Sequence, residues 1–175
     1  MQPITIRLAN EKDVNLIKNI SWQTFFDTFH PYNVKEDMEL FLKTNFNEET
    51  VRNEIHDKRN TFVIAYIKKQ VAGYAKLVES ENPEELGALK AVEISRIYAS
   101  KEKIGTGVGK ALMEQCLQFA IGKNKDVIWL GVWENNQKAI QFYRCWGFEK
   151  FGEHFFMLGN DRQNDWLMKK ELSIR

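Results

Sequence analysis

The segment Ile104-Gly105-Thr106-Gly107-Val108-Gly109-Lys110 places three alternate glycines between two regions with regular patterns. Ala91 to Ala99, before it, read as a strand, and Lys110 to Ile121, after it, have the apolar spacing of a helix. Glycine adopts backbone angles that other residues avoid and lets a ligand approach the main chain closely. The first amides of a helix have no partner within the helix, and the dipole there favours anions. The segment therefore predicts a loop that binds the phosphates of a ligand.

Two common phosphate-binding loops do not fit this segment. A P-loop needs a glycine separated by four residues from its Gly-Lys pair and a hydroxyl residue after the pair, but these positions hold Ile104 and Ala111. The dinucleotide fingerprint Gly-x-Gly-x-x-Gly lacks its third glycine, because Lys110 and Leu112 occupy the two available positions. Two interpretations stay open: a pyrophosphate loop of another type, or a flexible turn between a strand and a helix.

The composition indicates one ordinary globular domain. The chain has 175 residues and a formal net charge of +1, so we expect a single domain over residues 1–175 and no binding to nucleic acid. Cys116 and Cys145 lack the spacing of metal ligands, so no metal is expected and both are predicted to be buried thiols. No segment resembles a signal peptide or a membrane span, so a cytoplasmic location without membrane contact is expected.

The order of the predicted elements indicates a mixed α/β sheet: a meander, then a strand–helix–strand unit with parallel neighbours, then a closing hairpin. The predicted strands are Ile4–Leu8, Thr61–Ile67, Val71–Glu79, Ala91–Ala99, Val127–Val132, Phe148–Phe156 and Asp165–Glu171, with a loop Leu158–Asn164 in the closing hairpin. The predicted helices are one from Glu11 that is interrupted near Pro31, Val34–Asn45, Glu48–Asp57, Lys110–Ile121 and Gln137–Cys145.

Two further segments offer contacts for a substrate. The region from Trp22 to Pro31 is crowded with aromatic side chains. These either pack in the core or form one wall of a substrate pocket, with Asp27 adding negative charge. The acidic segment 79–85 is predicted to be a solvated loop, which attracts cationic substrates if it overhangs an active site.

Three motifs follow one another in order and at fixed spacing: Ile94-Ser95-Arg96-Ile97-Tyr98, Gly105-x-Gly107-x-Gly109-Lys110-Ala111-Leu112, and Asn136-x-x-Ala139-x-x-x-Tyr143-x-x-x-Gly147-Phe148. Together they resemble the acetyl-CoA-binding half of the GNAT N-acetyltransferases. Further motifs are Thr24-Phe25-x-Asp27-Thr28-Phe29, Ile128-Trp129-Leu130-Gly131-Val132-Trp133-Glu134, and His154-x-Phe156 followed by Gln163-x-Asp165. With these the sequence is similar to the PaiA-type spermidine/spermine acetyltransferases over nearly its whole length.

The resemblance implies a single-domain GNAT-like fold: a central mixed, twisted, mostly antiparallel sheet, flanked by helices, with a parallel pair splayed at the coenzyme site. It implies acetyl-CoA as co-substrate and a set of coenzyme-binding residues: Ile97, Tyr98, Ala99, Ile104, Gly105, Thr106, Gly107, Val108, Gly109, Lys110, Asn136, Ala139 and Tyr143. Ile104 departs from the family, which usually has Gln or Arg there. The pyrophosphate contact at that point is then expected to rest on backbone amides, helped by Lys103 or Lys110.

Acetyl transfer to an amine needs a base for the amine proton and benefits from an acid at the departing sulfur. By resemblance Tyr143 is the general acid; the alternative is a packing residue of its helix. Glu93, on the strand that enters the site, is the candidate base, directly or through water; the alternative is a salt bridge with Arg96 or a lysine. His154 is a second candidate base. The expected substrate-binding residues are Phe25, Asp27, Phe29, Glu93 and His154.

The expected function is therefore transfer of an acetyl group from acetyl-CoA to a primary amine, by direct attack of the amine. The resemblance favours a polyamine such as spermidine or spermine. Two alternatives stay open: an acetyltransferase of protein or peptide N-termini, and a non-catalytic module that binds acetyl-CoA for regulation. The expected assembly is a monomer or a homodimer.

Overall fold

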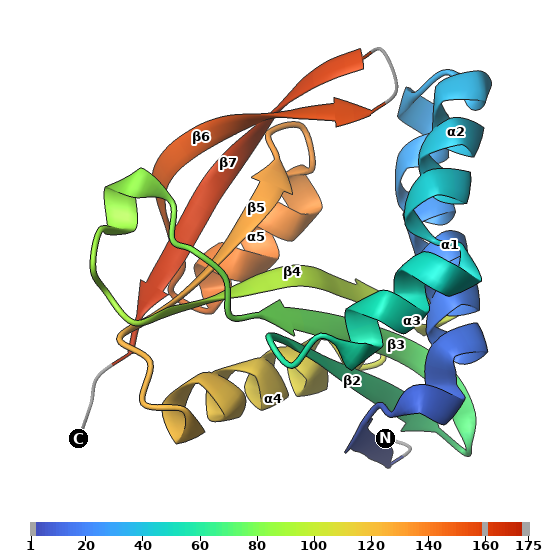
Figure 1. Cartoon of the computed structure of the whole chain (residues 1–175), viewed down its shortest axis with the longest axis horizontal. Coiled ribbons are helices and arrows are strands. Elements are labelled where there is room, and N and C mark those ends of the chain that lie inside the picture. Colours follow the sequence, from blue (N-terminus) through green and yellow to red (C-terminus); the bar gives the residue numbers. More distant parts are fainter. Residues whose placement is uncertain (1–2, 159–160, 173–175) are drawn as a thin grey trace.

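The computed structural model describes residues 3–158 and 161–172, which form one α/β domain around a seven-stranded sheet (Figure 1). The strands are β1 (Ile4–Leu8), β2 (Asn60–Ile67), β3 (Gln70–Val78), β4 (Ala91–Ala99), β5 (Val127–Trp133), β6 (Glu149–Leu158) and β7 (Asp161–Glu171). The helices are α1 (Val14–Phe29), α2 (Lys35–Asn45), α3 (Glu48–His56), α4 (Val108–Gly122) and α5 (Gln137–Cys145).

The strands lie in the order β1-β2-β3-β4-β5-β7-β6, and every neighbouring pair is antiparallel except β4 and β5. The predicted mixed sheet with one parallel pair is confirmed. The pair is parallel because α4 carries the chain back between the two strands. The hairpin of β2 and β3 turns at Lys68 and Lys69, whose φ angles of 49° and 66° are left-handed, as a tight hairpin turn requires.

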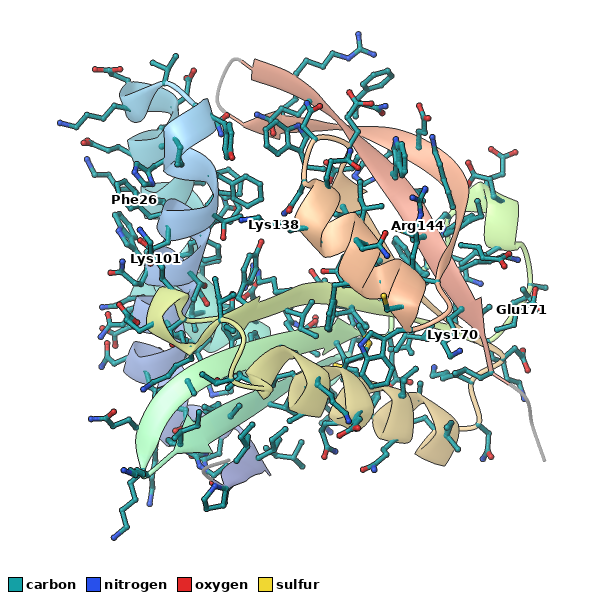
Figure 2. All side chains as sticks on the ribbon, turned by 180° about the vertical axis from the view of Figure 1, so that it is seen from behind. Phe26, Lys101, Lys138, Arg144, Lys170 and Glu171 are labelled. Atoms are coloured by element: carbon teal, nitrogen blue, oxygen red, sulfur yellow. The ribbon has the colours of Figure 1, made fainter. Side chains whose placement is uncertain are left out.

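Helices cover both faces of the sheet. On one face α4 and α5 pack over a core that includes the buried side chains of Leu112, Met113 and Ile128. On the other face α1, α2 and α3 enclose a second group that includes Ile17 and Tyr74. Seen from behind, α4 and α5 lie in front of the strands (Figure 2). The two faces of the sheet therefore differ in the helices that cover them, and we call them the α4–α5 face and the α1–α3 face.

Two boundaries differ from the sequence prediction. The predicted loop Leu158–Asn164 is wrong, because β6 continues through its first residue and β7 begins at Asp161; residues 159 and 160 lie outside the described residues. The polar residues of this segment suggest a loop, but cross-strand pairing keeps them in the hairpin. α4 begins at Val108 rather than Lys110, so the last glycine of the opening segment belongs to the first helical turn.

β4 carries a bulge at Ser95. Lys76 of β3 pairs with Arg96, but the next β3 residue, Leu77, pairs with Ile94. Ser95 is the extra residue between these pairs, and a bulge of this kind changes which face the following side chains occupy. The residues before and after Ser95 therefore do not follow a simple alternation.

β4 also separates from β5. The two strands pair over three residues, of which the last is Glu93 opposite Trp129. Beyond this pair the strands diverge, β4 running beneath α1 and β5 toward the closing hairpin (Figure 1). The predicted splay of the parallel pair is thus present, and Glu93 lies where it begins.

The described residues include no helix with the length and apolar composition needed to cross a membrane. Within the same ranges, no three His, Cys, Asp or Glu side chains gather as ligands for a metal ion. Cys116 is buried, and its burial raises the pKa of the thiol to about 12. The prediction that both thiols are buried is wrong for Cys145, which lies exposed on the outer surface of α5.

Candidate acetyl-transfer site

The glycine segment presents a row of main-chain amides without partners. Gly105 and Gly107 have left-handed φ angles of 81° and 94°. Among the described residues, the amides of Gly105, Gly107, Val108, Gly109 and Lys110 donate no hydrogen bond, and no side chain caps α4. A Cβ added at Gly105 meets no atom within 4 Å, so the space beside the turn is open. Unpaired amides at an open helix N-terminus fit a diphosphate.

The turn is held against the sheet by a glycine that the sequence analysis did not identify. A Cβ added at Gly73 of β3 would lie 2.5 Å from the carbonyl oxygen of Tyr98 and 2.9 Å from Cγ1 of Val108. Only a residue without a side chain permits this approach of β3 to the end of β4 and the start of α4. The signal was an isolated glycine in a strand pattern, which often marks close backbone approach.

The divergence of β4 and β5 leaves one edge of β4 without a strand partner. From Ile94 to Ala99 no residue of β4 pairs with β5. Ile97 and Ala99 pack on the α4–α5 face, whereas Tyr98 packs on the α1–α3 face. Unpaired donors and acceptors on a strand edge bind extended chains well. This edge therefore suits the amide-bearing pantetheine arm of coenzyme A.

Tyr143 enters the same gap from α5. Its side chain is 8% exposed and packs against Phe148, with ring centroids 6.0 Å apart. Its hydroxyl forms no hydrogen bond with another described residue. The hydroxyl oxygen is not fully buried, so a ligand can reach it. Burial, with a smaller effect of Cys116, raises the pKa of Tyr143 above its ordinary value. The phenol therefore stays protonated at neutral pH and is able to donate its proton.

Tyr98 stands near Tyr143 across the gap. Burial chiefly raises the pKa of Tyr98, and the neighbouring Tyr74 and Tyr143 raise it further. Tyr74 and Tyr98 stack with ring centroids 6.1 Å apart. The floor of the gap is therefore formed by neutral phenols rather than by charged groups.

Asn136 and Ala139 build the start of α5. The side-chain oxygen of Asn136 accepts a hydrogen bond of 3.2 Å from the amide of Ala139. Asn136 is thus the N-cap of α5 and orients this helix. Since α5 carries Tyr143, the cap also sets the position of the phenol.

Glu93 lies half-buried at the closed end of the gap. The alternative that it forms a salt bridge with Arg96 or a lysine is wrong, because Arg96 and Lys76 pair with Glu54 and the described residues offer Glu93 no ion pair. Burial raises the pKa of Glu93, and the positive charges of Lys76 and Arg96 oppose this increase. An unpaired carboxylate with a raised pKa has the properties of a general base.

The three residues predicted on the first helix have different surroundings. Phe25 is buried between α1 and α2, where it stacks on Phe41 at 4.6 Å between centroids. Phe29 reaches across to β5, with its ring centroid 6.2 Å from that of Trp133. Asp27 accepts hydrogen bonds of 3.0 Å from exposed Gln23 one turn earlier. Of the three, Phe29 makes a contact that connects α1 with β5.

His154 is exposed on β6. It pairs with Asp165 across β6 and β7, and its ring lies 3.3 Å from the position of a Cβ added to Gly131. Burial and, to a smaller extent, Glu134 raise the pKa of Asp165, while His154 opposes them. Gly131 thus leaves room for an acid and an imidazole beside β5.

A surface cavity of about 330 Å³ lies between the end of β5 and the closing hairpin. Aromatic, acidic and amide side chains line it, together with one arginine: Tyr32, Trp133, Glu134, Asn135, Phe155, Arg162, Gln163 and Asn164. Glu134 accepts a hydrogen bond of 3.1 Å from Asn164, and the side-chain oxygen of Asn164 is buried without a donor. Arg162 lies over the ring of Phe155, 3.5 Å from its centroid. The cavity offers acceptors and aromatic faces, the groups that bind an ammonium.

Other predicted contacts lie outside the gap. Ile104 is 71% exposed, and Lys110 is exposed and pairs with Glu114 at 3.8 Å. The acidic segment is a loop, but its Glu79 is paired with Lys123 and Lys125 at the C-terminal end of α4. Glu79 is therefore neutralised at the end of α4 opposite the glycine turn.

Comparisons with known proteins agree with this geometry. Residues 15–148 match the model of the acetyltransferase (GNAT) family. An uncharacterised N-acetyltransferase of Lactobacillus delbrueckii subsp. lactis is 40% identical over 173 residues, which cover 98% of this chain and 99% of that protein. The crystal structure of PaiA N-acetyltransferase from Thermoplasma acidophilum in complex with coenzyme A has a TM-score of 0.78 and 20% identity, covering 97% and 99% of the two chains. A mutant of the spermidine N-acetyltransferase SpeG from Vibrio cholerae has a TM-score of 0.69 and 20% identity, covering 96% and 93%.

Proposed function

The chain belongs to the GNAT family and is an acetyl-CoA-dependent N-acetyltransferase, and we propose that its acceptor is a primary amine of a polyamine such as spermidine or spermine. When bound, acetyl-CoA supplies an acetyl thioester, whose acetyl group passes to the amine nitrogen as the carbon–sulfur bond breaks and the coenzyme thiol is released. The proposal rests on two positions along β5: the unpaired carboxylate of Glu93 beside Trp129, and an acceptor-lined aromatic cavity at Trp133, where β5 ends.

The proposed coenzyme contacts follow from the unpaired main-chain groups. The unpaired amides of Gly105, Gly107, Val108, Gly109 and Lys110 hold the diphosphate, and the free edge of β4 around Ile97 and Tyr98 holds the pantetheine arm. Exposed Ile104 offers no polar side-chain atom, so the diphosphate depends on the amides. Gly73 supports this arrangement by keeping β3 against both elements.

The proposed chemical roles use two groups on opposite sides of the gap. Glu93 accepts the proton that the amine loses as its nitrogen bonds to the acetyl carbon. Tyr143, which is protonated at neutral pH, donates a proton to the sulfur as it leaves. One proton therefore leaves the nitrogen and one reaches the sulfur, and bulk water restores both residues between turnovers.

The proposed preference for a polyamine rests on the cavity beside Trp133 and Glu134. Trp133 and Tyr32 supply aromatic faces, and Glu134 accepts hydrogen bonds. An ammonium at this point gains cation–π and charge-assisted contacts while another nitrogen reaches Glu93. Two structural neighbours are a spermidine and a spermidine/spermine N-acetyltransferase from Vibrio cholerae, and this likeness supports the same class of acceptor.

The test is release of free thiol from acetyl-CoA with a panel of amines at fixed pH. We expect turnover with spermidine and spermine, a lower kcat/KM with monoamines, and loss of most turnover in Glu93→Gln. The variant Glu134→Gln should lower kcat/KM for polyamines by about tenfold, the loss of one charge-assisted contact, and leave monoamines unaffected. Turnover on a peptide N-terminus instead of polyamines moves the acceptor class to proteins. Coenzyme binding with no acceptor at all contradicts the catalytic proposal.

A further inference from the structure

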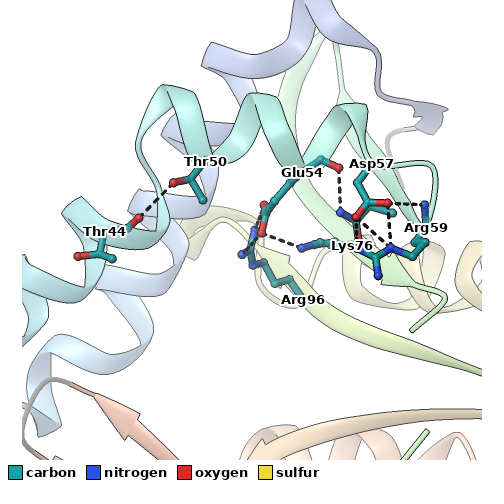
Figure 3. A network of polar contacts seen from close by, with 8 residues as sticks. Thr44, Thr50, Glu54, Asp57, Arg59, Lys76 and Arg96 are labelled. Atoms are coloured by element: carbon teal, nitrogen blue, oxygen red, sulfur yellow. Dashed lines mark hydrogen bonds and ion pairs between the residues drawn. The ribbon is translucent and has the colours of Figure 1, made fainter. Parts of the chain in front are cut away.

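Glu54, Lys76 and Arg96 form a buried cluster of three charged residues from three different elements (Figure 3). Glu54 of α3 accepts two hydrogen bonds of 2.8 Å from Arg96 of β4 and one of 2.7 Å from Lys76 of β3. The side chains are between 9% and 17% exposed. Arg96 also lies 4.9 Å above the ring of Phe46. The cluster is therefore fixed by packing as well as by charge.

The cluster contains two cations and a single anion. Burying charged groups away from water is costly unless opposite charges compensate them. The single negative charge of Glu54 compensates only one of the two positive charges of Lys76 and Arg96. Asp57, which also interacts with Lys76, is paired with Arg59 at 2.7 Å, whereas Glu93 has no ion pair with the described residues. The uncompensated positive charge of the cluster thus faces the carboxylate of the candidate base.

The bulge at Ser95 creates this relation. Glu93 and Arg96 are three residues apart, so regular alternation would place them on opposite faces of β4. Because Ser95 is inserted, Arg96 pairs with Lys76, and Glu93 pairs with Val78 two residues along β3. Lys76 is therefore the diagonal neighbour of Glu93 on the same face, about 7–8 Å away between α-carbons.

Among the described residues, Lys76 and Arg96 are the charged groups that act on Glu93. On the β5 side its register partner is Trp129, which is uncharged. Beyond Trp129, Lys169 of β7 is 3.3 Å from Glu171, its own partner. Burial raises the pKa of Glu93, and Lys76 and Arg96 lower it. The ionisation of Glu93 thus depends mainly on its burial and on the net charge of one neighbouring cluster.

We propose that Glu54, Lys76 and Arg96 are positioning residues that keep Glu93 ionised, so that the net charge of their cluster sets the pH at which the base becomes active. The inference rests on the proposed role of Glu93 as general base. It predicts that removing a cation and removing the anion have opposite effects, because they change the net charge of the cluster in opposite directions.

The test measures kcat/KM against pH for matched variants. Lys76→Met should move the midpoint of the acidic limb upward by about one pH unit, since one neighbouring charge is lost. Glu54→Gln, which keeps its hydrogen-bonding shape, should move the midpoint downward. The double variant should return close to the wild-type value, and Lys76→Arg, which restores the charge, should resemble the wild type.

The control is Glu48→Gln on the same helix, because Glu48 pairs with Arg52 at 2.6 Å while both side chains are about half exposed. It should leave the profile unchanged. Circular dichroism and thermal melting show whether each variant is folded. The proposal is overturned if the midpoint moves in the same direction in Lys76→Met and Glu54→Gln, or does not move in folded protein. A cluster with a merely structural role would change stability without opposite shifts of the midpoint.

A second readout does not depend on turnover. The carboxyl carbon of Glu93, assigned by comparison with Glu93→Gln, is followed by NMR through a pH titration of the wild type and Lys76→Met. The midpoint should be higher in the variant. If no amine is acetylated but this shift is present, the proposed function fails while the effect of the cluster on Glu93 stands. If amines are acetylated and the two midpoints coincide, the cluster proposal alone fails.

Discussion

The helices α4 and α5 border the same gap, yet their N-termini are built in opposite ways. α4 follows two left-handed glycines, and no side chain caps its first amides. α5 follows Asn136, whose side-chain oxygen caps it at Ala139. An N-terminus that the chain closes itself has one fewer amide for a ligand, whereas the uncapped one keeps its donors free.

The difference suggests separate roles for the two helices, one in coenzyme binding and one in the chemical step. α4 contributes main-chain amides and is expected to bind the coenzyme through them. α5 contributes a side chain, Tyr143, and its capped start fixes where that side chain lies. Binding and chemistry are therefore expected to respond separately to changes in the two helices, and the following variants test that separation.

The largest expected effect belongs to the side chain on α5. Tyr143→Phe keeps the ring packing against Phe148 and removes the hydroxyl, so we expect kcat to fall by about 10²-fold, the usual scale of general acid–base catalysis. Coenzyme affinity, measured by calorimetry, should stay near the wild-type value. An unchanged kcat removes Tyr143 from the mechanism, and a large loss of affinity shows that α5 also takes part in binding.

A smaller effect is expected at the uncapped start of α4. Gly107 has a φ of 94°, where a Cβ costs roughly 1–2 kcal/mol. Relief of this strain shifts the turn, so Gly107→Ala should weaken coenzyme binding by about tenfold, while kcat at saturating coenzyme changes little. A lower kcat with unchanged coenzyme affinity contradicts the hypothesis that α4 serves coenzyme binding and α5 serves the chemical step.

The matched control lies at the other end of the same helix. Gly122 does not have a left-handed φ, and a Cβ added there meets no atom within 4 Å. Gly122→Ala should leave coenzyme affinity unchanged and raise the free energy of unfolding by up to about 1 kcal/mol, because alanine favours helix. Calorimetry and urea denaturation measure the two quantities on both variants.

The smallest effect is expected at the cap of α5. Asn136→Ala removes the hydrogen bond to Ala139 and should lower the free energy of unfolding by about 1 kcal/mol, measured by urea denaturation. Asn136→Asp retains an acceptor and should keep most of that stability. If coenzyme affinity falls in Asn136→Ala while stability does not, the side chain binds the ligand and the comparison between the helices fails.

The sequence predicted the parts of this molecule that depend on local patterns. The glycines of the opening segment, the parallel pair and the cap at Asn136 all follow from short-range spacing and backbone chemistry. The strand start at Asp161 did not, because polar residues there are kept in a strand by pairing with β6. The isolated Gly73 in a strand pattern signals a close backbone approach, but its partners, Tyr98 and Val108, lie more than twenty residues away and are identified only by the structure.

The candidate site was predictable in outline and not in its electrostatics. The positions of Glu93 and Tyr143 at the gap follow from the motifs. The alternative of an ion pair between Glu93 and Arg96 was reasonable from their separation, but Glu54, on a helix 42 residues before Arg96, takes that partner. Competition between distant carboxylates for one guanidinium depends on tertiary packing, so it becomes visible only in the structure.

The bulge at Ser95 also makes the site depend on the pairing register of β4 as much as on the identity of its residues. If Ser95 were paired with β3 as an ordinary strand residue, the residues after it would exchange faces: Ile97 would move to the α1–α3 face, and the phenol of Tyr98 would enter the hydrophobic layer beneath α4. A conservative replacement of Ser95 is thus expected to be harmless. Its deletion should also keep both side chains on their present faces, because Ile94 and Arg96 would then follow each other in regular alternation opposite Leu77 and Lys76.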